Sequence, residues 1–384
     1  MANKRALSGA EAIAYAMRQI NPDVVALYPI TPQTPIAETF AKHVSDGLVD
    51  TELILTESEH SSLSAVIGAS ASGVRAMTAT ASQGLLYMYE MLSVASGLRL
   101  PIVMAVANRA ISSPINIHCD HSDSMSALDQ GWLQFYCESS QEAYEMMLFA
   151  LRLSESVNLP SMVCIDGFIT SHCVEPVVVF EDNLVKKFIG EYTPKHYLLD
   201  TKNPITVGPL VPPHSYFEVR SEMFNAFNDV KSNFNFISKE FKKIFKKDIK
   251  IFEDYFASDA DIVLIVLSSS ASTSKQVIDK FREQGKKVGL LRPILLRPFF
   301  YEEYFKILKN AKQIIVLERA EGPGSFSPIY KDLVVSFYGS KFSPQIYSYV
   351  FGLGGRDLYE KDIEDLISSF IKKKIPKERY IGLK

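Results

Sequence analysis

The chain has 384 residues, of which 47% are hydrophobic and 22% charged, a composition typical of a globular protein with two or three domains. The 41 Lys and Arg residues nearly balance the 44 Asp and Glu residues, and the formal net charge is -3. Such a chain lacks the basic surface of a dedicated nucleic-acid binder and the acidic excess of a solvating tail. Composition therefore favours small molecules and other proteins as partners.

Export and membrane insertion are not expected from this sequence. The first 20 residues lack the apolar core of a signal peptide. The longest apolar runs, 102–107 and 262–267, are far shorter than the roughly 18 residues that a membrane span needs. No CxxC pair, and so no zinc ribbon or iron–sulfur centre, is formed by the four cysteines, Cys119, Cys137, Cys164 and Cys173. We expect a cytoplasmic protein with reduced thiols and no metal held by this chain.

Residues 1–175 alternate between strand-like and helix-like segments, which predicts an α/β domain with a largely parallel sheet. Ser8 and Glu11 have the spacing of a capping box, which predicts a helix that ends near Ile20. The apolar runs 24–30 and 101–107 predict strands that are buried on both faces. In chain order, strands are predicted at 24–30, 52–56, 75–80, 101–107 and 161–166, and helices at 59–72, from the loop 81–84 to about 97, and at 141–156.

The composition changes after residue 175, because Lys occurs only at positions 4 and 42 before this point and is frequent afterwards. The segment 176–256 is rich in proline up to Pro213 and then predicts an amphipathic helical region from Tyr216 to about Phe256. Its Lys pairs alternate with aromatic and aliphatic residues, which favours a solvated helix face over a nucleic-acid patch. We interpret 176–256 as an irregular and helical linker region.

From residue 257 the alternation resumes and predicts a second, smaller α/β domain that extends to residue 384. Its strands are expected at 262–268, 287–291, 313–318 and 345–350, and its helices at 271–283, 302–308, 329–337 and 361–373.

Several local motifs have more than one interpretation. The segment 352–356 (GLGGR) follows a strand but lacks the GxGxxG spacing, so a tight turn is favoured over a phosphate site. The same spacing is absent after the first strand, which argues against a nicotinamide-dependent dehydrogenase. A polar loop contains four side chains that could bind a metal, but without a periodic helical pattern or a distant third ligand a metal site is not favoured: His118, Asp120, His121 and Asp123.

Three residues at predicted strand or helix ends could carry chemistry. Thr31 lies between two prolines, where its hydroxyl could bond local backbone or a ligand. Glu59 begins a predicted helix, where a carboxylate is favoured by the helix dipole or serves as a buried hydrogen-bonding group. Arg109 ends an apolar strand and could hold a carboxylate bidentately or fasten a loop. Taken alone, each residue has a structural explanation.

Together, these segments resemble the alpha subunits of the pyruvate:ferredoxin oxidoreductase family, also called pyruvate synthases, within the 2-oxoacid:ferredoxin oxidoreductases. The motifs match in order and spacing, and they span nearly the whole chain. They are Tyr28–Pro32, Glu57–Ser61, Thr78–Leu85, Val106–Ala110, Pro114–His118, Asp120–Asp123, Asp166–Phe168, Ser171–His172, Arg297–Phe299 and Gly352–Asp357.

The resemblance implies a pyrimidine-binding domain of the thiamine-diphosphate fold with a parallel sheet, followed by a smaller domain of the transketolase carboxyl-terminal type. It also implies thiamine-dependent oxidative decarboxylation of pyruvate to acetyl-CoA in anaerobic metabolism, with electrons passed to ferredoxin. By the same resemblance, Glu59 is the catalytic residue that contacts N1' of the cofactor's aminopyrimidine, and Thr31 and Arg109 hold the substrate carboxylate.

The sequence lacks a GDG motif followed by Asn, and it lacks a cysteine cluster. The resemblance therefore implies that thiamine diphosphate is shared with a beta subunit, that Mg2+ and [4Fe-4S] clusters are held by partner subunits, and that gamma and delta subunits complete the complex. The stretch Asn108–Ile117 looks like the pyruvate branch, with coenzyme A as acyl acceptor. A subunit for a branched-chain 2-oxoacid and a non-catalytic scaffold subunit stay as alternatives. The chain departs from the family at Cys119, where glycine is common, and at Cys173, where threonine is usual.

Overall fold

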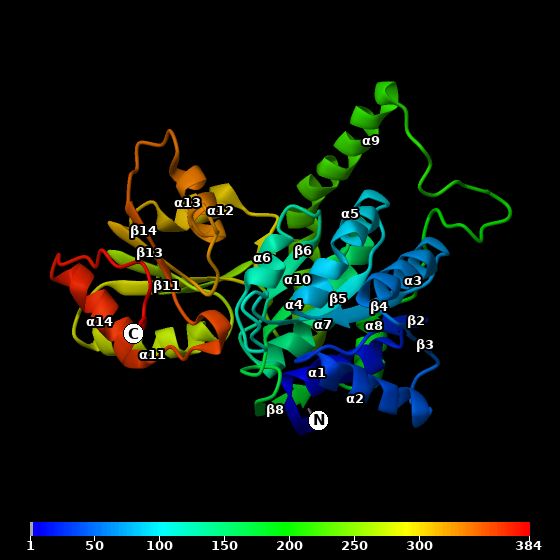
Figure 1. Ribbon diagram of the computed structural model, residues 1–384, viewed down its shortest axis with the longest axis horizontal. Helices are drawn as coiled ribbons and strands as arrows, with labels where there is room; N and C mark the ends of the chain where they lie inside the picture. Colours follow the sequence, from blue (N-terminus) through cyan, green and yellow to red (C-terminus); the bar gives the residue numbers. More distant parts are fainter. Residues whose placement is uncertain (1–2) are drawn as a thin grey trace.

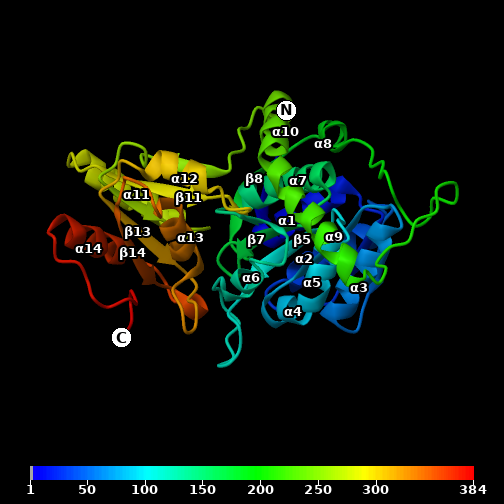
Figure 2. The same cartoon turned by 90° about the horizontal axis from the view of Figure 1, so that it is seen from above.

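Two α/β domains lie side by side in the computed structural model, which describes residues 3–384. Figure 1 shows the first domain in blue to green and the second in yellow to red, and Figure 2 shows the same division from above. Within residues 3–384, no helix combines the length and the apolar character that a bilayer crossing requires.

The first sheet has seven strands in the order β12-β6-β7-β5-β4-β2-β3. Only β12 runs antiparallel to its neighbour, and the other pairs are parallel. Every residue of β5 is buried, which confirms the burial predicted for 101–107, and β2 is buried except for the half-buried Val24. β4 and β7 are buried throughout as well. The strands are β2 (Val24–Leu27), β3 (Glu52–Leu55), β4 (Ala76–Thr80), β5 (Val103–Asn108), β6 (Leu133–Tyr136), β7 (Ser161–Asp166) and β12 (Leu295–Arg297).

Helices cover both faces of this sheet. The predicted capping box is confirmed at the first helix, because Ser8 Oγ accepts a hydrogen bond from the Glu11 amide at 3.2 Å and Glu11 Oε2 accepts one from the Ser8 amide at 2.8 Å. The helix predicted from the loop 81–84 to about 97 is divided in two at Met88. One core contains α1 (Gly9–Ile20), α2 (Thr34–Ser45) and α7 (Ser140–Val157), and the opposite core contains α3 (Glu59–Ala71), α4 (Ser82–Tyr87) and α5 (Tyr89–Gly97).

Helices of the predicted linker region belong to the first domain's core. The buried rings of Phe188 from α8 (Asp182–Ile189) and of Phe234 and Phe241 from α10 (Val230–Phe245) join this core, and the Phe149 ring of α7 lies 4.8 Å from the Phe234 ring. By contrast, α9 (Pro213–Ala226) projects away from the domain in Figure 1. A 3-10 turn at Phe227–Asp229 connects α9 to α10.

The prediction that the helical segment continues to Phe256 is wrong. The helix ends at Phe245, where Lys246 adopts a left-handed backbone conformation with φ 60°. The following strand β9 (Phe252–Tyr255) pairs antiparallel with the second sheet instead. Other elements had no predicted counterpart, among them α2, β6, β12 and the paired strands β1 (Asn3–Ser8) and β8 (Val174–Val179).

The second sheet has the order β14-β13-β10-β11-β9, with every pair parallel except β11 with β9. Its elements agree closely with the predicted alternation. They are β10 (Ile262–Ile265), α11 (Ser270–Glu283), β11 (Val288–Pro293), α12 (Tyr301–Leu308), β13 (Gln313–Glu318), α13 (Pro328–Phe337), β14 (Gln345–Val350) and α14 (Glu360–Ile371), with a short 3-10 turn η2 at Leu353–Gly355.

The two domains are joined by shared structure. One hydrophobic core contains Leu63 and Met104 of the first domain and also Val263, Leu291 and Leu333 of the second. In addition, β12 follows β11 of the second domain in the chain, yet it pairs with β6 and forms an edge of the first sheet. The predicted division into domains at 1–175 and 257–384 with a linker region at 176–256 stays a prediction.

Candidate active-site edge of the first sheet

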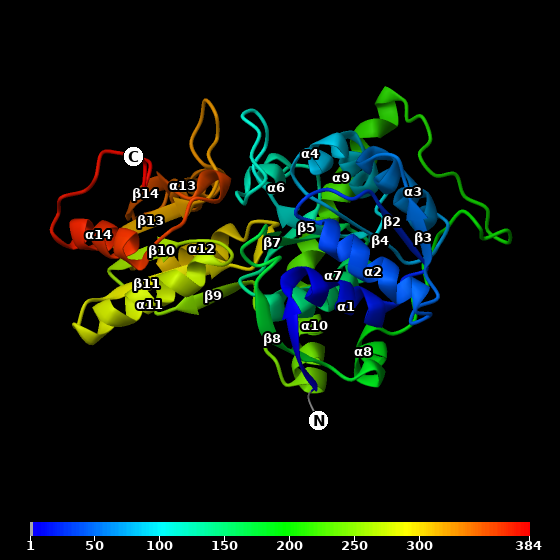
Figure 3. The ribbon, with the colours of Figure 1, turned by 60° about the horizontal axis from the view of Figure 1, so that its bottom comes forward.

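The carboxyl ends of β2, β4, β5 and β7 meet at one edge of the first sheet, because these strands are parallel neighbours. Figure 3 shows the four strands side by side between two layers of helices. Ligands of open α/β sheets usually bind at this edge. The loops that leave it contain the predicted site residues Thr31 and Arg109 together with the start of α4.

The structure brings Arg109 and Thr31 together. Arg109 Nη1 donates to the carbonyl oxygen of Thr31 at 2.9 Å, and Arg109 Nε donates to the carbonyl oxygen of Asn116 at 3.1 Å. The Arg109 side chain is largely buried, whereas Thr31 is exposed. Within residues 3–384, neither the Nη2 group of Arg109 nor the Thr31 hydroxyl makes a hydrogen bond. The Arg109 guanidinium is thus held through Nε and Nη1, while its Nη2 group and the Thr31 hydroxyl can still bond a ligand.

Glu59 is the first residue of α3, where Ser58 caps the helix by accepting a hydrogen bond from the Ser61 amide at 3.2 Å. Only 7% of Glu59 is exposed, and no hydrogen bond or ion pair reaches its carboxylate within residues 3–384. A buried carboxylate without a partner is costly for folding. Its presence here indicates a functional role rather than a contribution to stability.

The space beside Glu59 depends on a glycine. A methyl group placed on Gly84 in α4 would lie 2.7 Å from Glu59 Oε1 and 2.5 Å from Thr80 Oγ1, both too close for real contacts. Thr80 ends β4, and its hydroxyl is buried without a hydrogen-bond partner among the described residues. Glu59 and Thr80 therefore form a small group of unpaired polar atoms, and the space beside them stays open because Gly84 has no side chain.

Asp123 connects the loops after β4 and β5. Its Oδ2 accepts hydrogen bonds from the amides of Ser82 and Arg109, both at 2.9 Å. Its Oδ1 accepts from Asn108 Nδ2 at 2.7 Å and from the Ser124 amide at 2.8 Å. The side chain is completely buried. One carboxylate therefore fixes the backbone at both strand ends that carry the candidate site.

Burial raises the pKa of Asp123 to about 6, although hydrogen bonds from Asn108, Arg109, Ser82 and Ser124 act in the opposite direction. No ion pair reaches this carboxylate within residues 3–384. All four donors are neutral groups, so they compensate only part of the loss of hydration.

Two protein-family models match this chain. The model described as "Pyruvate flavodoxin/ferredoxin oxidoreductase, thiamine diP-bdg" matches residues 15–239, which is more than half of the chain. The model described as "Pyruvate:ferredoxin oxidoreductase core domain II" matches residues 260–363. The chain belongs to the pyruvate:ferredoxin oxidoreductase family.

Curated relatives agree with this membership over nearly the full length. Pyruvate synthase subunit PorA of Thermotoga maritima is 49% identical over 99% of this chain and 98% of its own. The subunit of the same name from Methanocaldococcus jannaschii is 42% identical over 100% of this chain and 99% of its own. Ketoisovalerate oxidoreductase subunit VorA of Pyrococcus horikoshii is 40% identical over 96% of this chain and 94% of its own.

Solved structures share the fold. The 2-oxoglutarate:ferredoxin oxidoreductase from Magnetococcus marinus has a TM-score of 0.76 at 20% identity, over 98% of this chain and 66% of that chain. A split-gene transketolase described as an inactive beta4 tetramer has a TM-score of 0.56 at 9% identity, over 96% of this chain and 100% of that chain. The predicted family, fold class and enzyme class, an oxidoreductase subunit, are thereby confirmed.

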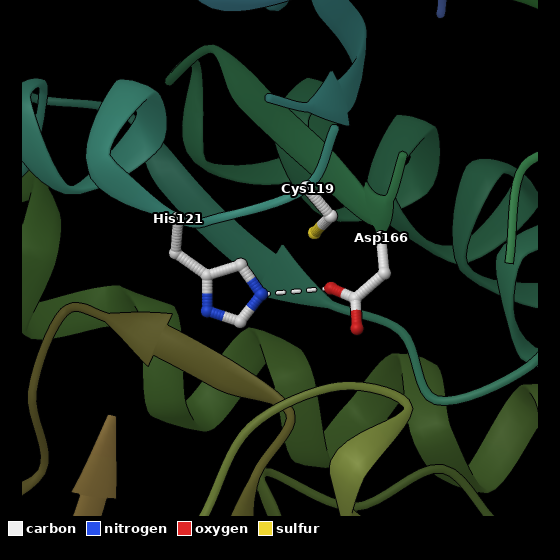
Figure 4. A group of neighbouring side chains, drawn as sticks. All are labelled: Cys119, His121 and Asp166. Carbon is white, nitrogen blue, oxygen red and sulfur yellow. Dashed lines mark hydrogen bonds and ion pairs between the residues drawn. The ribbon is translucent and has the colours of Figure 1, made fainter. Parts of the chain in front are cut away.

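The polar loop after β5 does not gather its four ligand-capable residues into one group. Instead, Cys119 and His121 meet Asp166 at the end of β7, and one potential ligand atom from each lies within 4.8 Å of the others (Figure 4). His121 Nε2 and Asp166 Oδ1 are hydrogen-bonded at 2.7 Å, and all three side chains are buried. The interaction of His121 with Asp166 could not be predicted, because the two residues belong to separate motifs.

The second domain completes this group, which we call the interdomain cluster (Cys119, His121, Asp166, Ser269 and Arg319). The amide of Ser269 donates to Asp166 Oδ2 at 3.3 Å, its hydroxyl makes a short hydrogen bond to the same oxygen, and the His121 amide donates to the Arg319 carbonyl at 2.8 Å. The buried Arg319 guanidinium acts electrostatically on Asp166 and Cys119. A metal ion bound by these side chains would be repelled by the positive charge of Arg319, and it would replace the hydrogen bond between His121 and Asp166. The cluster is therefore a hydrogen-bonded joint between the domains.

The charges of the interdomain cluster decide the ionisation of its acidic groups. Burial alone would raise the pKa of Asp166, but His121, Arg319 and the Ser269 hydroxyl outweigh it and hold the pKa well below the usual range. Burial raises the pKa of the Cys119 thiol well above its ordinary value, so the sulfur is neutral.

The glycine-rich segment after β14 is the tight turn that its spacing favours. Gly352, Gly354 and Gly355 all have positive φ, and the Gly355 amide donates to the Cys119 carbonyl at 2.7 Å. Asn116 Nδ2 donates to the Gly354 carbonyl at 2.9 Å. This turn of the second domain thus supports the loop whose Asn116 carbonyl accepts from Arg109.

Proposed function

We propose that this chain is the alpha subunit of a pyruvate synthase, in which Arg109 and Thr31 hold the 2-oxoacid carboxylate and Glu59 contacts the aminopyrimidine of thiamine diphosphate. The observation that carries the proposal is the position of all three residues at one edge of the first sheet, each with unused hydrogen-bonding capacity among the described residues. The 49% identity to a pyruvate synthase subunit over nearly the whole chain supports it.

The Arg109 guanidinium suits the substrate's carboxylate. It stays charged at any physiological pH and can bind a planar carboxylate through parallel hydrogen bonds. Its bonds to the Thr31 and Asn116 carbonyls restrict the orientation of the side chain before substrate arrives. Because less side-chain entropy is then lost on binding, the preformed guanidinium binds a carboxylate more tightly than a mobile one would.

The polar group beside Gly84 fits the pyrimidine part of thiamine diphosphate. Glu59 offers a buried carboxylate without a partner, and Thr80 offers an unpaired hydroxyl next to it, whereas Gly84 leaves room that a methyl group would fill. When bound, thiamine diphosphate supplies the carbon nucleophile and the electron sink for decarboxylation of a 2-oxoacid. In our proposal, Glu59 holds a proton between its carboxylate and the N1' atom of the pyrimidine.

Partner subunits supply the remaining chemistry in this proposal. All four cysteines are free, and the three that are buried do not gather as a cluster site within the described residues. We infer a beta subunit that holds the diphosphate, Mg2+ and a [4Fe-4S] cluster, with gamma and delta subunits and ferredoxin for further electron transfer, in the cytoplasm. The substrates are pyruvate and coenzyme A. A branched-chain 2-oxoacid is less favoured, because the ketoisovalerate relative is only 40% identical, against 49% and 42% for the two pyruvate synthase relatives.

The test is anaerobic reduction of a viologen dye by this chain, alone and assembled with beta, gamma and delta subunits, in the presence of thiamine diphosphate, Mg2+, coenzyme A and a panel of 2-oxoacids. We expect reduction only by the assembly, fastest with pyruvate. A faster rate with 2-oxoisovalerate would move the substrate to the branched-chain class. No reduction by a cluster-loaded assembly with any 2-oxoacid would favour the scaffold alternative.

A further inference from the structure

The carboxylate of Asp123 is the structural link between the two site loops. It lies in the short helix α6 (Ser122–Ser126) and bonds the Ser82 amide across 41 positions of sequence and the Arg109 amide across 14. Both amides share the single oxygen Oδ2. Any change in this oxygen therefore acts on the backbone of Ser82 and on that of Arg109 at once.

The backbone at Ser82 shows how closely this region is constrained. Ser82 has a φ of 46°, in the left-handed region that residues other than glycine rarely adopt. The conformation is held by the hydrogen bond from the Ser82 amide to Asp123 and by a second one, at 2.6 Å, from the Ser82 hydroxyl to the carbonyl of Ala110. Such strain persists only where the surroundings enforce it, and it is concentrated at functional sites.

We propose that Asp123 is a positioning residue for 2-oxoacid binding. By holding the Arg109 and Ser82 amides on one oxygen, it sets the distance between Arg109, which binds the substrate carboxylate, and the unpaired polar atoms of Glu59 and Thr80. The inference rests on the proposed function, since it assumes that Arg109 binds the substrate carboxylate. The Arg109 amide is fixed to Asp123, and its guanidinium is fixed to Thr31 and Asn116. Arg109 is thereby held both at its backbone amide and at its guanidinium.

The ionised form of Asp123 is required for this role. A protonated carboxyl group carries a hydrogen on one oxygen and cannot accept four hydrogen bonds. The titratable neighbours that act on Asp123, or that it acts on, are Cys119, Cys164 and Tyr136, and burial raises the pKa of each well above its ordinary value. These three groups stay neutral below pH 8. In the segment just before α6, Asp120 bonds Ser122 and the amide of Gly354, and His121 bonds Asp166.

The experiment compares Asp123→Ala with wild type in the assembled complex. An alanine has no acceptor, so the Ser82 and Arg109 amides both lose the oxygen that they share. We expect the KM for pyruvate to rise at least about tenfold, with the KM for coenzyme A unchanged. Asp120→Ala is the matched control, because Asp120 is a buried aspartate of the same loop that bonds neither Ser82 nor Arg109. An unchanged pyruvate KM in a correctly assembled Asp123→Ala complex would overturn the inference.

A second variant keeps the inference testable if Asp123→Ala does not assemble. Asn108→Ala removes one donor to Asp123 and one to the Ser124 hydroxyl, whereas Asn108 Oδ1 has no hydrogen-bond partner among the described residues to lose. Fewer hydrogen bonds stabilise the ionised form, so the acid limb of kcat/KM for pyruvate should move to higher pH. An acid limb that stays at the wild-type pH would assign the titration to another group and reject the role of Asp123. Wild type without turnover on any 2-oxoacid would instead reject the proposed function.

Discussion

Two aspartates near the active-site edge are both fully buried, yet their pKa values are shifted in opposite directions. Asp123, within the first domain, accepts hydrogen bonds from four neutral donors, and burial raises its pKa to about 6. Asp166, in the interdomain cluster, bonds His121 and Ser269 and lies near Arg319, which together hold its pKa well below the usual range despite burial. Similar burial therefore has different consequences, which depend on whether a positive charge is nearby.

The difference separates two tasks. In the interdomain cluster, the Arg319 guanidinium of the second domain compensates the Asp166 carboxylate of the first domain, which stabilises the contact between the two domains. The active-site edge instead leaves its carboxylates without a compensating cation, and Glu59 has no partner at all within the described residues. We therefore expect substitutions at the edge to reduce activity more than stability, and substitutions in the cluster to do the reverse.

The largest effect is expected at Glu59. Glu59→Gln keeps the size of the side chain and removes the charge, so turnover of the assembled complex should fall by about 100- to 10,000-fold, the usual contribution of a positioned acid or base. The measurement is pyruvate-dependent dye reduction at saturating cofactor. Glu57→Gln is the matched control, because Glu57 is an exposed glutamate two residues earlier. Loss of activity in both variants to the same degree would point to helix α3 as a whole rather than to the Glu59 carboxylate.

A smaller effect is expected at Arg109, the residue proposed to bind the substrate carboxylate. Arg109→Lys keeps the charge but cannot bond the Thr31 and Asn116 carbonyls and a carboxylate together, so kcat/KM for pyruvate should fall about 100-fold. Arg99→Lys is a suitable control, because Arg99 also bonds backbone carbonyls, those of Asn158, Val157 and Glu222, at a distance from the site. Wild-type kcat/KM in Arg109→Lys would show that the guanidinium geometry does not hold the substrate.

The two aspartates should give opposite pH dependences of stability. Burial raises the folded-state pKa of Asp123 to about 6, so its ionisation costs about 3 kcal/mol of stability, and this cost appears as pH rises from about 4 to 6. The pKa of Asp166 is lowered, so its contribution is present above about pH 4 and is lost as pH falls further. Thermal unfolding from pH 3 to 8 measures both. Asp123→Asn should remove the decline between pH 4 and 6, and Asp166→Asn should remove the acid loss; an unchanged curve in either variant would contradict the assigned shift.

The smallest effect is expected at Cys119. Its thiol is buried and neutral and behaves as a small hydrophobic group, so Cys119→Ala should cost about 1 kcal/mol and leave activity unchanged. Cys164→Ala, at an equally buried position in β7, provides the comparison. Loss of a bound metal ion together with much lower stability in Cys119→Ala alone would show that the interdomain cluster binds a cation after all.

The elements with strong local patterns were predicted well from the sequence. The capping box of Ser8 and Glu11 is present, and β7, β13 and β14 have the predicted bounds. The short strand β6 and the edge strand β12 were missed, because a strand of three or four residues has too few side chains to show a pattern. The helix predicted to reach Phe256 was wrong, because pairing with β11 determines the conformation of β9.

The candidate site was only partly accessible to sequence reasoning. Thr31, Glu59 and Arg109 were identified through their place in family motifs, and the structure places all three at one edge of the sheet. The roles assigned to them stay predictions. Asp123 was noticed only as one of several polar residues in a loop, because nothing in the sequence shows which backbone amides its carboxylate meets.

By itself, the sequence determined the alternation of strands and helices, the family and the residue types available for chemistry, since these depend on local hydrophobic period and short motifs. Only the tertiary structure decided which groups meet. The order of strands in the sheet places Thr31 beside Arg109 across 78 residues, and packing of the second domain brings Ser269 to Asp166 across 103. The physical reason is that hydrogen bonding and desolvation depend on distances between remote segments, which local pattern does not encode.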